Sequence, residues 1–228
     1  YRMVPPFIEL TNLTKNFGNG KGIFDLSFGV QQGEVFGFLG PNGAGKSTTI
    51  RHLMGFVKPQ SGSCQIMGKD CFSQAALIQQ SVGYLAGEIA FIEDMSGISY
   101  LNFIADMKGI RDRSSIRDLL YRFELNPRGK IKKMSKGMKQ KIGLVAAFMG
   151  DPSVLILDEP TSGLDPLMQN RFVELLLERK KKGSTVFMSS HIFEEVEKTC
   201  NRTAIIREGR LVDIVQMKEL SKLRNRIY

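Results

Sequence analysis

The sequence has few of the features that mark a secreted, zinc-binding or membrane-spanning protein. Its 228 residues include no tryptophan and only three cysteines, Cys64, Cys71 and Cys200. Their spacing fits neither a metal site nor a set of paired disulfides, so we expect the reduced, incidental thiols of a cytosolic protein. No apolar run approaches the roughly 18 residues that a transmembrane helix requires. The chain also has no internal repeat and no low-complexity linker.

Acidic residues are too few to balance the basic ones. The chain has 32 Lys and Arg against 23 Asp and Glu, a net charge of +9. Such a balance is compatible with nucleic acid, an anionic membrane surface or phosphate ligands. Much of the excess is local, because segment 128–141, RGKIKKMSKGMKQK, has seven basic residues and no acid. Charge alone therefore identifies no partner.

The periodicity of the apolar residues predicts both strands and helices. The predicted strands are 7–17 and 22–30, joined around Asn19-Gly20, then 34–40, a turn and strand at 61–70, 153–158, 184–190 and a hairpin at 203–214. The predicted helices are 46–56, 98–110, 114–125, 136–149, 166–183, 192–200 and 217–228. Segment 153–158, SVLILD, is continuously apolar, which is typical of a parallel sheet covered on both faces.

We therefore predict one α/β domain with a mostly parallel sheet, an N-terminal antiparallel β subdomain and an inserted α-helical subdomain. Residues 1–84 and 149–215 would form the core with its antiparallel subdomain, and residues 85–148 the helical subdomain. Residues 216–228 would begin a C-terminal extension.

The segment 38–50, FLGPNGAGKSTTI, contains the pattern G-x-x-x-x-G-K-[ST] between a predicted strand and a predicted helix. Glycines let the backbone N–H groups of such a loop surround a phosphate, and the following helix directs its positive end toward it. Lys46 would neutralise the β- and γ-phosphates, and Ser47 would offer a hydroxyl to Mg²⁺. This context predicts a P-loop NTPase core. The expected nucleotide-binding residues are Gly40, Pro41, Asn42, Gly43, Ala44, Gly45, Lys46, Ser47 and Thr48.

A second motif follows the apolar strand in SVLILDEPTSGLD. Asp158 ends the strand at the edge where parallel sheets bind ligands, so it can reach Mg²⁺ directly or through water. Glu159 comes next and could orient or deprotonate the attacking water. Two solvated acids that merely open a loop are the alternative, which is less favoured downstream of a phosphate loop.

A third motif, MSKGM, places Ser135 and Gly137 at the start of a predicted helix, where a hydroxyl and backbone N–H groups can contact phosphate. With the two sites above, it resembles the ATP-binding domain of the ATP-binding-cassette (ABC) proteins. The signature of that family is LSGGQ; here Lys136 replaces a glycine and Met138 the glutamine. The resemblance spans residues 7 to about 214 and implies that the cofactors are ATP and Mg²⁺.

The resemblance assigns roles to three further residues. Asp165 in SGLD stands at the aspartate of the family's D-loop, and His191 in MSSHIFEEVE at the switch histidine that contacts the γ-phosphate. Phe17 stands where the family has an aromatic residue that stacks on adenine. A phenylalanine in the core at a strand end is the competing interpretation of Phe17.

One position departs from the family pattern. After the loop that follows SVGYL the family often has a glutamine that reaches Mg²⁺ and the attacking water, but this chain reads GYLAGEIAF. Gly87 or Glu88 occupies that position, depending on the alignment. Gln79 and Gln80 come too early, at a predicted helix end. Glu88 is a possible substitute.

Two kinds of function remain: a subunit that powers a separate membrane permease, and an ABC-type ATPase that acts on nucleic acid or the ribosome. The segment between Lys46 and Ser135 is too short for the long coiled coil of the DNA-repair relatives, and each motif occurs once, unlike the two cassettes of the ribosomal relatives. Both observations favour the permease subunit, with no nucleic-acid partner expected. The segments YLAGE, DMSGISYLNF and SKGMKQK resemble exporter ATPases of the bacitracin type.

The resemblance also implies how the subunit would assemble. Two cassettes, identical or homologous, would pair head to tail so that the MSKGM segment of one copy covers the ATP of the other. The pair would lie in the cytoplasm, at the inner face of the membrane, through its permease. We expect the permease to contact a groove between the core and the helical subdomain, lined by residues 86–100 and the helix that follows, where Ile89, Phe91, Ile92 and Met95 would be exposed. The alternative, expected for about half of these four residues, is that they pack the core of the helical subdomain.

Overall fold

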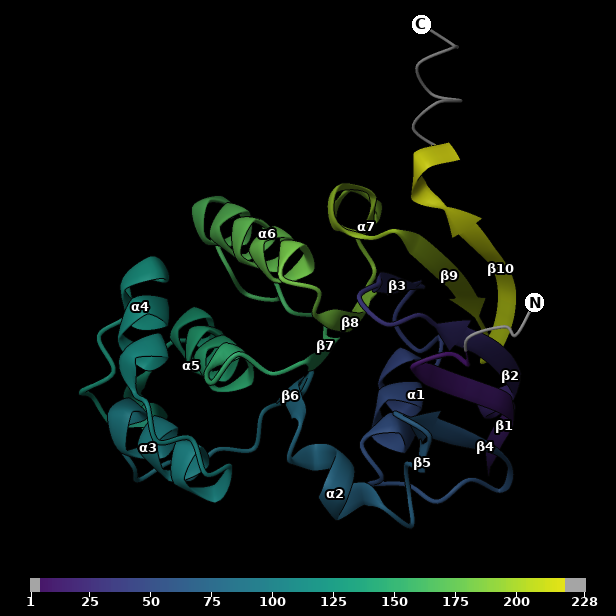
Figure 1. Cartoon of the computed structure of the whole chain (residues 1–228), viewed down its shortest axis with the longest axis horizontal. Helices are drawn as coiled ribbons and strands as arrows, with labels where there is room; N and C mark the ends of the chain where they lie inside the picture. The colour runs from purple at the N-terminus through teal and green to yellow at the C-terminus, as the bar shows by residue number, and fades with distance from the viewer. Residues whose placement is uncertain (1–4, 220–228) are drawn as a thin grey trace, which may run out of the picture.

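The computed structural model describes residues 5–219, which form two sheets with helices around and between them (Figure 1). The larger sheet has the strand order β10-β9-β3-β8-β7-β6, and all neighbours in it are parallel except β9 and β10. Its strands are β3 (Val35–Leu39), β6 (Val82–Leu85), β7 (Val154–Asp158), β8 (Thr185–Ser190), β9 (Arg202–Arg207) and β10 (Arg210–Gln216). The predicted mostly parallel α/β sheet is confirmed.

The central strands of this sheet separate two hydrophobic cores by simple alternation. On β7, Leu155 and Leu157 face one core, while Val154 and Ile156 face the other. Successive side chains of a strand point to opposite faces, so an uninterrupted apolar run buries both. The first core lies toward the helices α5 (Lys136–Phe148) and α6 (Pro166–Lys181), and the second toward the antiparallel sheet.

The smaller, antiparallel sheet has the order β2-β1-β4-β5. Its strands are β1 (Ile8–Gly18), β2 (Lys21–Val30), β4 (Ser61–Ile66) and β5 (Lys69–Asp70). Asn19 and Gly20 form the predicted turn between β1 and β2, with φ of 53° and 73°. Positive φ at both central positions matches the right-handed twist of a hairpin.

Helix α1 (Lys46–Leu53) lies between the two sheets, and its Ile50 and Leu53 are fully buried. It is shorter than the predicted helix 46–56. Gly55, at φ 74°, donates its N–H to the carbonyl of His52, and Phe56 donates to that of Arg51. A glycine in the left-handed region in this position terminates a helix.

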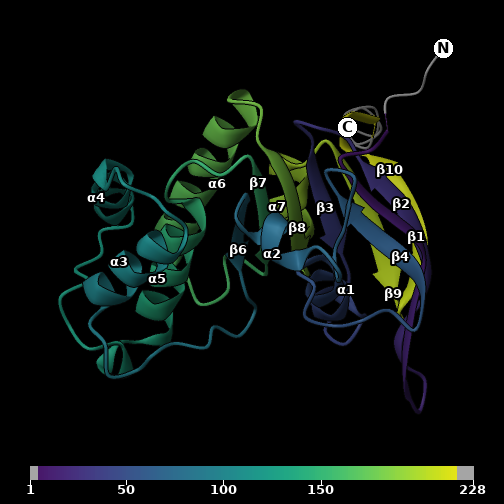
Figure 2. The same ribbon diagram turned by 60° about the horizontal axis from the view of Figure 1, so that its bottom comes forward.

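The remaining helices are α2 (Ala75–Gln79), α3 (Gly97–Met107), α4 (Ser114–Arg122), α5 (Lys136–Phe148), α6 (Pro166–Lys181), α7 (Phe193–Thr199) and a 3₁₀ turn at Ile131–Lys133. In both views α3, α4 and α5 lie on one side of the larger sheet, and β1, β2 and β4 lie on the other (Figures 1 and 2). None of the described helices is long and apolar enough to cross a bilayer. Most of the predicted extension 216–228 lies outside the described residues.

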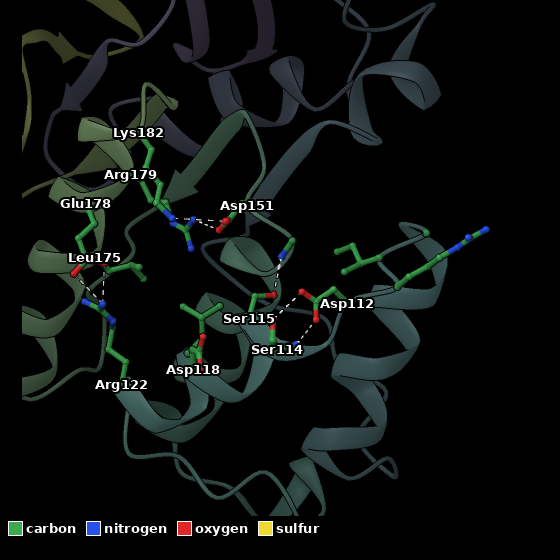
Figure 3. A pocket seen from close by; sticks show the side chains of 15 residues that line it. Asp112, Ser114, Ser115, Asp118, Arg122, Asp151, Leu175, Glu178, Arg179 and Lys182 are labelled. Carbon is green, nitrogen blue, oxygen red and sulfur yellow. Dashed lines mark hydrogen bonds and ion pairs between the residues drawn. The ribbon is translucent and has the colours of Figure 1, made fainter.

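Helix α4 is joined to the core by polar contacts around a cavity of about 650 Å³ (Figure 3). Arg122 of α4 donates two hydrogen bonds to the carboxylate of Glu178 on α6, at 2.8 and 2.9 Å. Arg179 of α6 is buried and pairs with Asp151, which follows α5. Ser115 of α4 accepts a hydrogen bond from the N–H of Gly150. These polar contacts add to the apolar packing of Ile116 and Leu119 of α4 in the first core.

Candidate active site

The phosphate loop joins β3 to α1, as the motif predicts. Gly45 has φ 103°, and a Cβ on it would lie 2.8 Å from the side chain of Ile23. A Cβ on Gly40 would lie 2.5 Å from the carbonyl oxygen of Ile206. Lys46 is only 5% exposed, and its ammonium donates to the carbonyls of Gly40 and Pro41 at 2.5 and 3.1 Å. The loop is therefore a closed turn with its lysine folded back across it.

A cavity of about 640 Å³ lies over this loop. Of the predicted nucleotide-binding residues, Phe17, Asn42, Gly43, Gly45, Lys46, Ser47 and Thr48 line it, together with Glu159. Gly40 and Pro41 contribute only through the carbonyls that hold Lys46, and Ala44 is buried. Gly20, Lys21, Gly22 and Glu208 also line the cavity and were not predicted from the sequence. They come from the β1–β2 turn, the first two residues of β2 and the β9–β10 turn, which only the tertiary structure brings to the phosphate loop.

Phe17 lies at the end of β1 with 57% of its surface exposed, beside the phosphate loop. The interpretation of Phe17 as a core residue is therefore wrong. The ammonium of Lys15 lies 6.0 Å from the centre of its ring. An exposed ring at the rim of a phosphate-binding cavity is placed to stack on a flat aromatic group.

The Glu159 carboxylate lies between two of the other predicted residues. Its Oε1 is 3.1 Å from the Lys46 ammonium, and its Oε2 is 2.7 Å from Nδ1 of His191. The backbone of Glu159 is in the left-handed region, at φ 49°, and its N–H donates to Ser189 Oγ at 3.0 Å. Three loops, after β3, β7 and β8, thus place a lysine, a glutamate and a histidine in one row.

Asp158 ends β7, as predicted, and is 3% exposed. Ser189 donates to its Oδ1 at 2.5 Å. Asp158 and Ser47 line a second cavity, of about 690 Å³. A serine hydroxyl and a carboxylate are the hard oxygen ligands that Mg²⁺ takes alongside phosphate oxygens. The pair therefore fits Mg²⁺, although residues 5–219 hold no group of three His, Cys, Asp or Glu side chains suited to a metal.

The loop after β6 approaches Asp158 at Gly87. A Cβ on Gly87 would lie 2.8 Å from Oδ2 of Asp158. A longer side chain at position 87 would therefore require the loop or Asp158 to move. Glu88 is exposed and lines the second cavity with Asp158 and Ser47.

The expected permease groove is only partly where the sequence predicts it. The second cavity is lined by Ala86, Gly87, Glu88, Ile89, Ala90 and Tyr100, and also by Phe56, Tyr84 and Arg51. Phe91, Ile92 and Met95 are not among its lining residues. Phe91 packs on Tyr100, with ring centres 5.1 Å apart, and against the first core.

Burial, with the nearby charge of Asp158, raises the pKa of Tyr84 to about 12.

None of the signature residues is among the described residues that line the cavity over the phosphate loop. Ser135 is the N-cap of α5 and accepts the N–H of Met138 at 3.2 Å. A Cβ on Gly137 would lie 2.9 Å from the carbonyl oxygen of Gly163. Asp165 is the N-cap of α6 and accepts the N–H of Met168 at 2.9 Å. The segments around MSKGM and SGLD are therefore in contact within one chain.

Three supporting residues were not predicted. Gln140 donates to the carbonyl of Pro160 at 2.9 Å and so ties α5 to the loop after β7. Ser190 donates to the buried Glu195 at 2.5 Å and accepts the N–H of Ile192, on either side of His191. Burial raises the pKa of the Glu195 carboxyl, although the bond from Ser190 opposes this. A glutamate four residues after His191 in a predicted helix was the available signal.

The fold and this row of residues define a P-loop ATPase built as a nucleotide-binding cassette. A model of the ABC transporter family matches residues 23–162. The chain therefore belongs to the ABC transporter family, and it is an ATP-binding cassette with ATPase activity.

Similar proteins agree with this assignment. The chain is 38% identical to the bacitracin transport ATP-binding protein BcrA of Bacillus licheniformis, over 97% of this chain and 73% of that protein. It is 36% identical to the linearmycin resistance ATP-binding protein LnrL of Bacillus subtilis, over 91% and 68%. Among solved structures, an ATP-binding subunit of an ABC transporter superimposes with a TM-score of 0.84 at 29% identity, covering 96% of this chain and 93% of that one.

Proposed function

We propose that this chain is the ATP-hydrolysing subunit of an exporter, and that it powers a separate membrane permease. The main structural support for an ATP-hydrolysing site is the position of the Glu159 carboxylate between Lys46 and His191. Similarity to BcrA and LnrL, a bacitracin transport protein and a linearmycin resistance protein, supports export. An ATPase acting on nucleic acid or ribosomes is not favoured, since the relatives described above are transport or resistance proteins.

Each residue of the site would have one task. Lys46 binds the β- and γ-phosphates, while Ser47 and Asp158 hold Mg²⁺, which neutralises phosphate charge when bound. Phe17 stacks on the adenine. Glu159 accepts a proton from, or orients, the attacking water, and His191 holds the γ-phosphate from the other side of that carboxylate. The existing contact of His191 with Glu159 supports a shared role.

Ser135, Gly137 and Asp165 require a second copy in this proposal. They do not line the cavity that contains Lys46 and Ser47. A two-fold head-to-tail pair would place the MSKGM segment of each copy over the ATP of the other, which creates two equivalent sites. The permease would dock at the cavity lined by Phe56, Tyr84 and Tyr100. The subunit would thereby reach the membrane surface through its partner.

The decisive experiment compares the full chain with its Glu159→Gln variant. General-base catalysis contributes about 10²–10⁴-fold to a rate, so steady-state ATP hydrolysis with Mg²⁺ should fall by that range. Glu208→Gln is the matched control, because Glu208 lines the same cavity and makes an ion pair with Arg207 at 3.9 Å instead of with Lys46. If Glu159→Gln hydrolyses ATP at the wild-type rate, Glu159 is not the catalytic carboxylate, and Glu88→Gln would be examined next.

A further inference from the structure

Lys136 is the first residue of α5 and stands between Ser135 and Gly137. Its side chain is exposed. Two neighbouring lysines have acidic partners, Lys132 with Asp94 at 2.6 Å and Lys139 with Glu93 at 3.7 Å. Lys136 forms no ion pair or side-chain hydrogen bond with any residue of the described range 5–219. The Lys136 ammonium therefore has no charged partner within the described part of one chain.

The position of this side chain is nevertheless well defined, because its stem packs on Gly163. A Cβ on Gly163 would lie 3.2 Å from Cγ of Lys136 and 3.4 Å from its Cδ and Cε. Gly163 has φ 77° and belongs to the turn between Glu159 and Asp165. A lysine commonly packs its methylene groups on a surface while its ammonium remains in water. The stem of Lys136 therefore lies where the MSKGM and SGLD segments meet.

We infer that the Lys136 ammonium binds the γ-phosphate of an ATP held by a second copy of this chain. The inference rests on the head-to-tail pairing proposed above, in which Ser135 and Gly137 contact that phosphate from either side of Lys136. The triphosphate already receives one cation, Lys46, from the copy that binds it. A second lysine, from the opposite copy, would neutralise further charge on the γ-phosphate at the interface. ADP has no γ-phosphate and would not gain this contact. Lys136 would thus make pairing more specific for ATP.

The experiment measures pairing directly. The full chain carrying Glu159→Gln is the parent, because it should retain ATP, and its dimer dissociation constant with Mg²⁺ and ATP is measured by sedimentation velocity. Lys136→Met in this background keeps the stem on Gly163 and removes the charge, whereas Lys136→Arg keeps a cation. Lys133→Met is the matched control, since Lys133 is exposed nearby and likewise has no acidic partner among residues 5–219.

A hydrogen bond to a charged group is worth about tenfold in affinity. A two-fold pair contains the contact twice, so Lys136→Met should weaken the dimer about a hundredfold. Lys136→Arg and Lys133→Met should pair as the parent does. Added salt should weaken the parent more than Lys136→Met, because salt screens the contact that the variant lacks.

Two results would overturn the inference and can be told apart. If the parent pairs with ATP and Lys136→Met pairs equally well, the lysine acts only through its stem, and the head-to-tail proposal stands without it. If the parent does not pair at any protein concentration, the proposed pairing itself fails. If Lys136→Met lowers the melting temperature, Lys136→Gln serves as a second neutral variant. Pairing of Lys136→Gln as tight as that of the parent would also overturn the inference.

Discussion

The ammonium of Lys46 lies 3.1 Å from the carboxylate of Glu159, so the lysine of the phosphate loop and the proposed catalytic base form an ion pair. Lys46 is 5% exposed and Glu159 21%, which leaves little water to screen the pair. In the proposed function, a γ-phosphate bound to Lys46 would compete with this carboxylate. Glu159 would then keep its contact with His191 and be available to accept a proton. This competition would link nucleotide binding to activation of the proposed base through one ammonium group.

This competition predicts that Glu159→Gln binds ATP more tightly than the wild type. The amide keeps the shape of the side chain but no longer attracts Lys46 as an anion. An increase of up to about tenfold is expected, because a hydrogen bond to a charged group contributes about 1.5–3 kcal/mol and the amide replaces part of it. Isothermal titration calorimetry with ATP measures the change. A weaker affinity in the variant would contradict the competition.

Lys46→Ala should have the opposite effect on nucleotide binding. Loss of the ammonium removes about 1.5–3 kcal/mol of binding free energy, so the dissociation constant for ATP should rise at least tenfold. Lys58→Ala is the control, because Lys58 lies against Phe72, outside the cavity over the phosphate loop. Unchanged affinity in Lys46→Ala would remove the assignment of this cavity as the nucleotide site.

Phe17→Ala should weaken ATP binding through loss of stacking. Stacking of a base on an aromatic side chain is worth about 1–3 kcal/mol, which corresponds to roughly 5- to 150-fold. Inorganic triphosphate has no base, so its affinity should not change, and Phe17→Tyr should retain ATP affinity. If ATP and triphosphate are weakened equally, Phe17 supports the loop and does not stack.

Phe56→Asp should disrupt association with the permease while the chain itself stays folded. Phe56 is 51% exposed at the second cavity and contacts Tyr84 with ring centres 5.6 Å apart. A charge there would oppose an apolar partner helix. Phe91→Asp is the contrasting variant. Phe91 packs against the core, so a charge at this position should lower the melting temperature. Co-purification with the permease is the measurement; normal recovery with Phe56→Asp would place the contact elsewhere.

The buried Glu195 should make stability depend on pH. Burial raises the pKa of its carboxyl in the folded protein above the usual value of 4.5. The folded state then binds the proton more tightly than the unfolded state, so the stabilising contribution is present below about pH 4.5 and is lost as the pH rises through the folded pKa.

Glu195→Gln should therefore flatten the dependence of the unfolding free energy on pH in that window. Glu194→Gln, an exposed neighbour on α7, should leave the dependence as it is. Urea unfolding at a series of pH values provides the comparison. An equal slope in Glu195→Gln and the wild type would show that another group titrates there.

The sequence determined the parts of this protein that depend on local chemistry. Short-range sterics and periodicity set the backbone conformation of three segments. These are the phosphate loop at 40–47, the apolar strand that ends at Asp158 and the turn at Asn19-Gly20. Helix α1 is shorter than predicted, because the left-handed glycine that ends it, Gly55, precedes residues that still fit helical spacing. The short strand β6 was not predicted at all.

Only the tertiary structure decided which side chains meet. Lys46, Glu159 and His191 come from loops after β3, β7 and β8, and they meet because these three strands are neighbours in the sheet order β3-β8-β7. Whether Phe17 is buried and whether Phe91 lines the groove depend on what packs against them. The stem of Lys136 lies on Gly163 because Gln140 ties α5 to the loop after β7. These contacts join residues distant in sequence, and their energies arise only when packing brings them together.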